Sequence, residues 1–192
     1  MLTQIRSAAV VILLVAMLAP EAIARVKVTV NFDKAFDFKS MKTWGWGPDG
    51  PGSVMMARTA NDNPDAMKKA AEPLIVEAIT KEMAARALVQ SSSAPDLVVT
   101  YYLLLSNSMS SQTMGQFLPA TSAWGLPFFP QATQSLEYVD QGSLVIDLAA
   151  NKTVVWRGVA HAKIKPDTAY KKREELIREG VRDLMRRYPT KQ

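Results

Sequence analysis

The sequence predicts an α+β domain, in which a mainly antiparallel sheet of about five strands carries two main helices on one face. Three observations support this class. Over residues 142–161, apolar and polar residues alternate on both sides of a polar turn at 151–152, which indicates a β-hairpin. The same alternation over 26–32 indicates a half-buried strand. Helical periodicity with start signals covers 63–88 and 168–188.

Residues 1–24 have the pattern of a secretory signal peptide. The start is positively charged, residues 8–19 are apolar, and small residues at 22–24 suit a signal peptidase. The apolar run is shorter than the roughly 20 residues of a membrane-spanning helix, although an uncleaved anchor is the alternative. We therefore expect export, cleavage after residue 24, and a single domain over 25–192.

Two further strands and a turn-rich loop are predicted before the hairpin. Residues 41–46 and 97–105 are expected strands, and the second is almost wholly apolar or aromatic, which is typical of a strand covered on both faces. The loop 45–52 has the G-x-G-x-x-G spacing of dinucleotide-binding proteins. That site needs a helix that begins inside the motif, whereas Pro48 and Pro51 interrupt this loop, so we interpret the match as chance.

The two helices have recognisable start signals. Asn63 and the proline after it predict the first N-terminus, and Pro73 predicts either a kink or the start of the helix's main part. The second helix is expected to begin at a cap formed by Asp167 or Thr168. An arginine row along it could bind anionic lipid or polymer, but we interpret it as a solvated face with intrahelical ion pairs. The row consists of Arg178, Arg182 and Arg186.

Residues 106–134 form a long segment without a charged residue. Long irregular loops in compact domains are often functional or disordered. Two interpretations remain open: the segment folds back over a sheet edge, or its apolar side chains contact a partner or a membrane. We favour contact for Trp124, because Gly125 and Pro127 beside it favour an exposed turn. The candidate contact loop consists of Phe117, Trp124, Phe128 and Phe129.

The residue inventory limits the chemistry. The chain has no cysteine, so it has no disulfide, no thiol nucleophile and no lipid-anchoring residue at the expected mature start. His161 is the single histidine, which excludes a zinc site of the usual kind. A net charge of +5 on an exported chain gives no reason to expect nucleic acid, and we expect no cofactor. Asp147 and Arg157 are expected to form a cross-strand ion pair that contributes ~0.5 kcal/mol if exposed.

Several short motifs, in this order and spacing, resemble the bacterial domain-of-unknown-function family 4136. They lie at 37–38, 42–46, 95–101, 142–148, 155–158 and 188–189. The resemblance covers nearly the whole expected mature chain and implies an envelope protein without an assigned activity. Many relatives look like outer-membrane lipoproteins, but this chain lacks the cysteine. It also has Ala87 where the family tends to end a helix with glycine.

These observations lead to a functional expectation. We expect a periplasmic, non-lipidated cell-envelope protein that acts as a non-enzymatic binding or scaffold module. Its partner would be an envelope protein, a lipid or a cell-wall polymer, with peripheral membrane contact as one form of that association. The alternative is a hydrolase that attacks an envelope polymer through carboxylates, because spacing in the sequence does not show which carboxylates lie together.

Overall fold

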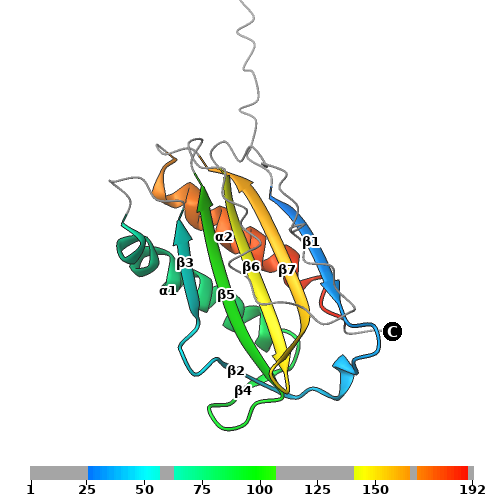
Figure 1. Cartoon of the computed structure of the whole chain (residues 1–192). Coiled ribbons are helices and arrows are strands. Elements are labelled where there is room, and N and C mark those ends of the chain that lie inside the picture. Colours follow the sequence, from blue (N-terminus) through cyan, green and yellow to red (C-terminus); the bar gives the residue numbers. More distant parts are fainter. Residues whose placement is uncertain (1–25, 57–62, 107–140, 165–167, 190–192) are drawn as a thin grey trace, which may run out of the picture.

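A computed structural model describes residues 26–56, 63–106, 141–164 and 168–189. These described residues form one sheet of seven strands and two α-helices (Figure 1). In chain order the elements are β1 (Lys27–Phe32), the 3₁₀ turn η1 (Phe38–Ser40), β2 (Thr43–Trp46), β3 (Gly52–Met56), α1 (Pro64–Ala84), β4 (Val89–Gln90), β5 (Leu97–Ser106), β6 (Gln141–Ala150), β7 (Thr153–Lys163) and α2 (Tyr170–Met185).

The sheet is mixed. Its order is β1-β7-β6-β5-β2-β4, and β3 pairs with β5 beyond the end of β2. The β1–β7, β7–β6 and β6–β5 pairs are antiparallel, whereas β2, β3 and β4 join by parallel pairs. The α+β class is therefore confirmed, but the predicted count and the mainly antiparallel arrangement are partly wrong. The physical reason is the α1 crossover between β3 and β5, which lets neighbouring strands run in the same direction.

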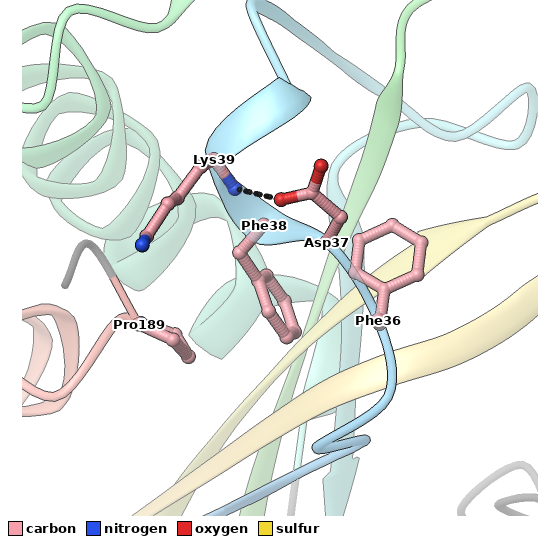
Figure 2. A pocket seen from close by; sticks show the side chains of 5 residues that line it. All are labelled: Phe36, Asp37, Phe38, Lys39 and Pro189. Carbon is pink, nitrogen blue, oxygen red and sulfur yellow. Dashed lines mark hydrogen bonds between the residues drawn. The ribbon is translucent and has the colours of Figure 1, made fainter. Parts of the chain in front are cut away.

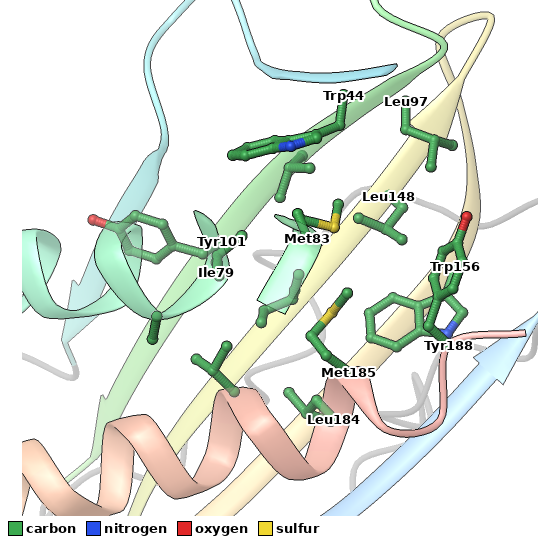
Figure 3. Packing of buried hydrophobic residues seen from close by; sticks show 14 of the residues in the cluster. Trp44, Ile79, Met83, Leu97, Tyr101, Leu148, Trp156, Leu184, Met185 and Tyr188 are labelled. Atoms are coloured by element: carbon green, nitrogen blue, oxygen red, sulfur yellow. The ribbon is translucent and has the colours of Figure 1, made fainter. Parts of the chain in front are cut away.

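The core lies between the sheet and the two helices, which cover the same face as predicted (Figure 1). Every second residue of β5 from Leu97 to Leu103 is buried there. Trp44, Trp156 and Met83 are also fully enclosed (Figure 3). A Cβ on Gly158 would lie 2.5 Å from Cη2 of Trp156, so glycine at this position makes room for the indole. The Trp-x-Gly part of the 155–158 motif is thus a packing requirement.

The helix boundaries follow local chemistry. The Asn63 side chain accepts a hydrogen bond from the N–H of Ala66 at 2.9 Å, and Pro64 opens α1, as predicted. Pro73 lies inside α1, which continues to Ala84. The helix end then uses Ala87 at φ 58°, and the N–H of Leu88 donates to the Met83 carbonyl at 3.2 Å. The chain thus forms a left-handed helix end without the glycine that normally favours it.

The start of α2 differs from the prediction. Its N-cap is Ala169, which forms no side-chain cap, so a cap at Thr168 is wrong, and Asp167 lies outside the described residues. The Thr168 carbonyl instead accepts a hydrogen bond from Nε of Arg173 at 2.9 Å.

Within the described ranges, no helix is long and apolar enough to cross a membrane.

Candidate functional site: polar pairs on the sheet face opposite the helices

The sheet face opposite α1 and α2 carries polar pairs between its two longest antiparallel neighbours, β6 and β7. Leu144, Ile146 and Leu148 belong to the core cluster, so the residues that alternate with them point to the opposite face. Three pairs of opposed residues lie on that face: Ser143 opposite His161, Val145 opposite Val159, and Asp147 opposite Arg157. The first and third pairs are polar, and the valine pair lies between them.

Asp147 and Arg157 form a bidentate ion pair. Nε of Arg157 donates to Oδ1 of Asp147 at 2.7 Å, and Nη2 donates to Oδ2 at 2.6 Å. The predicted pair is therefore confirmed. The value of ~0.5 kcal/mol, which was expected for an exposed pair, does not apply, because Asp147 and Arg157 are only 3% and 1% exposed. A buried pair contributes differently from an exposed one: the loss of one partner costs about 3–5 kcal/mol, since the other charge stays buried.

The strand ladder explains why these side chains meet so closely. The N–H of Asp33 donates to the Val155 carbonyl at 2.8 Å, so the alternation of the ladder turns the Arg157 backbone toward β1. Asp147 and Arg157 are consequently a non-hydrogen-bonded pair of the β6–β7 ladder, a class in which the Cα atoms are only about 4.5 Å apart. The same reasoning applies to Ser143 and His161.

Burial and hydrogen bonding act against each other at Asp147. Burial raises the pKa of the carboxyl group, and the Arg157 hydrogen bonds and charge oppose that rise. Burial also raises the pKa of Tyr102, on β5, and the Asp147 charge adds to that effect. Because both carboxylate oxygens already accept hydrogen bonds from one guanidinium, Asp147 is poorly suited to take a proton from a substrate.

Ser143 and His161 form the second polar pair. The Ser143 hydroxyl lies 2.7 Å from Nδ1 of His161, and burial lowers the pKa of the imidazole. Asp147 is four residues along β6 from Ser143, about 13 Å at the rise of an extended strand. Its carboxylate is also held by Arg157, so these three groups do not form the Ser-His-Asp arrangement of hydrolases.

A second carboxylate, Asp96, links two of the sequence motifs. Its Oδ2 accepts hydrogen bonds from the N–H of Lys42 at 2.9 Å, from the N–H of Thr43 at 2.8 Å and from the Thr43 hydroxyl at 2.9 Å. The backbone hydrogen bond from Lys42 and those from Thr43 lower the pKa of Asp96. The contact ties the start of β5 to the start of β2, so we assign Asp96 a structural role.

A pocket lies where the segment after β1 meets Pro189, which follows α2 (Figure 2). The Phe36 and Phe38 rings pack edge to face at 4.8 Å between centroids, and Phe38 packs likewise on Tyr188 at 5.5 Å. The Lys39 side chain extends on the Pro189 side of the pocket. The lining residues are Phe36, Asp37, Phe38, Lys39 and Pro189.

Other predicted groups have structural roles or lie outside the described residues. Arg178 contacts Glu77 of α1 and Glu174 of α2 at 3.0 Å, and these hydrogen bonds raise its pKa. Arg186 contacts Asp183 at 3.4 Å, so ion pairs on the arginine row are confirmed. The described residues contain no group of three His, Asp or Glu side chains that could hold a metal ion. The candidate contact loop, Phe117, Trp124, Phe128 and Phe129, lies outside the described residues and stays a prediction.

Sequence reasoning missed the Ser143–His161 pair, although a signal for it was available. Once Asp147 is placed opposite Arg157, the antiparallel register brings residues 143 and 161 opposite each other as well. The Tyr101 hydroxyl was also missed. It donates to Oε2 of Glu72 at 2.7 Å, a contact between β5 and α1 that no local pattern indicates.

The described residues form an α+β domain, in which two helices cover one face of a seven-stranded mixed sheet and buried polar pairs lie on the other face. The chain belongs to the family described as domain of unknown function (DUF4136), whose model matches residues 28–190. The resemblance inferred from the motifs is thereby confirmed. No curated protein matches the chain.

Several solved structures are similar to this chain, among them the following two. A crystal structure of a DUF4136 family protein from Bacteroides thetaiotaomicron is 16% identical, with a TM-score of 0.50, and the match covers 86% of this chain and 96% of that one. A PDZ domain protein from Parabacteroides distasonis is 15% identical, with a TM-score of 0.51, and the match covers 88% of this chain. This chain spans only 38% of that protein. At these identities the likeness shows the fold alone.

Proposed function

We propose that this protein is a non-enzymatic binding or scaffold module of the bacterial cell envelope. The observation that carries the proposal is the state of Asp147, a buried carboxylate with both oxygens held by Arg157. A general acid or base needs a carboxyl group within reach of the substrate and free to exchange a proton. Asp147 meets neither condition, whereas a rigid sheet stapled by such a pair suits a module that presents a surface.

The location in the envelope rests on the sequence. The pattern of residues 1–24 supports export, and the absence of cysteine supports a form that is not lipidated at its mature start. The residues that line the pocket also fit a binding role better than catalysis. Two phenylalanine rings, Phe36 and Phe38, form its apolar part, whereas Asp37 contributes a side chain that accepts a hydrogen bond from the Lys39 N–H at 3.1 Å.

Measuring substrate turnover distinguishes the proposed binding module from the hydrolase alternative. We expect purified protein to bind one class of envelope component, whether protein, lipid vesicle or cell-wall polymer, and to leave generic ester and glycoside substrates intact. Asp147→Asn tests the buried carboxylate, and Asp65→Asn tests an exposed carboxylate in the first turn of α1. Turnover that a single Asp or Glu substitution abolishes, without loss of fold by circular dichroism, would overturn the proposal.

A further inference from the structure

β1 forms one edge of the sheet, and its outer side has no strand partner among the described residues (Figure 1). The N–H of Asp33 points to β7, because it donates to the Val155 carbonyl at 2.8 Å. By the alternation of an antiparallel ladder, the backbone N–H and C=O groups of Val28, Val30 and Phe32 therefore point outward. Edge strands with such open groups are templates for pairing with another strand.

Two side chains occupy part of this edge. The Val28 carbonyl accepts a hydrogen bond from Nη1 of Arg187 at 3.0 Å, and the Phe32 N–H donates to Oδ1 of Asn31 at 3.2 Å. Both contacts confirm that these backbone groups face away from β7. These contacts lie near the two ends of the strand, and the outward N–H and C=O groups of Val30 lie between them.

The strand is complementary to itself. When residues 27–33 pair antiparallel with a second copy about Val30, Lys27 lies opposite Asp33 at both ends. Val28 lies opposite Phe32, two side chains that are half-buried on the helix face. The outward backbone groups of Val28, Val30 and Phe32 all fall in hydrogen-bonded pairs in this register. Charge, apolar contact and backbone pairing thus agree on one alignment.

We propose that two copies of this chain pair through β1, antiparallel about Val30, and join their sheets across a twofold axis. In this arrangement the Phe32 N–H donates to the Val28 carbonyl of the other copy. The Asn31 and Arg187 contacts to those groups give way. Arg187 therefore competes with the second copy, and its removal favours pairing. This inference does not depend on the proposed function, because a binding module and an enzyme could both pair in this way.

The test is sedimentation equilibrium over a concentration series, on the chain as purified from cells and with its N-terminus determined by mass spectrometry. Lys27→Asp places like charges at both ends and should weaken pairing about tenfold, if each end is worth ~0.7 kcal/mol. Asp33→Lys should act alike, and the double variant should restore pairing. Lys34→Glu changes the net charge by the same amount as Lys27→Asp, outside the strand, and serves as the control.

Two further measurements make the outcome decisive. Val30→Pro removes an outward N–H but no β1–β7 hydrogen bond, so it should abolish pairing. Because the Val30 side chain packs against the core, Val30→Ala, which shortens the side chain but keeps the N–H, is the matched control and should still pair. Arg187→Ala should tighten pairing. Hydrogen exchange at the Val30 amide should slow as concentration rises. A monomer at every concentration, or a dimer that ignores Lys27→Asp and Val30→Pro, would overturn the proposal, and so would pairing of β1 with another protein in place of the second copy.

Discussion

The Asp147–Arg157 pair can be tested by a double-mutant cycle on stability. Asp147→Leu and Arg157→Met each leave one charge buried without its partner, and each should lower the free energy of unfolding by about 3–5 kcal/mol. The double variant replaces the pair with apolar side chains of similar size at positions only 3% and 1% exposed, so it should be near the stability of the parent chain. Urea denaturation followed by circular dichroism gives the three values.

The cycle separates coupling from simple loss of packing. If the two side chains act as one unit, the summed losses of unfolding free energy in the two single variants should exceed the loss in the double variant by several kcal/mol. A matched cycle at Val145 and Val159, the apolar pair between the two polar pairs, controls for the effect of changing any opposed residues at this level of the sheet. Additive losses at Asp147 and Arg157, within about 0.5 kcal/mol, would refute the view that this pair staples β6 to β7.

Three further predictions follow from the structure and the sequence. Ala87→Gly should raise the free energy of unfolding by about 0.5–1 kcal/mol, because φ 58° strains alanine, and a urea titration measures the gain. Burial lowers the pKa of His161 in the folded chain, so stability should fall as the pH drops below 6.5, the ordinary pKa of an unfolded histidine. Thermal melts from pH 8 to pH 5 measure this fall, which should be absent in His161→Gln. Trp124→Ala should weaken association in vesicle and pull-down assays but keep the melting temperature, whereas a large loss of stability with unchanged binding would contradict a contact loop.

Local patterns predicted the longest elements. Alternation identified β1, β6 and β7, and the Asn63–Pro64 start signal placed the beginning of α1. The strands β3 and β4 were missed for different reasons: β4 has only two residues, and the β3 sequence Gly-Ser-Val-Met-Met does not alternate between polar and apolar residues. Ordering the strands requires contacts between distant segments, such as the Asp96 hydrogen bonds to Thr43, and these leave no local trace.

The candidate site was only half predictable for a similar reason. A two-residue turn at 151–152 without irregularity would place Asp147 opposite Trp156. A register shift between Leu148 and Ala149 instead places Leu148 opposite Trp156, both in the core, and Asp147 opposite Arg157. A β-bulge inserts an extra residue into one strand, and the alternation of the sequence does not show where that residue lies. The depth of burial of the pair likewise comes from tertiary packing.

The most direct test of a non-enzymatic module is photo-cross-linking in intact cells, with the captured molecule analysed by mass spectrometry. A photoreactive residue at Val89 or Tyr170 samples the surface, because these side chains are 65% and 60% exposed, and one at the fully buried Leu148 is the control. Our account predicts capture of an envelope component whose covalent structure is unchanged. Capture of a cleaved component, with cleavage lost after a single Asp or Glu substitution, would contradict it.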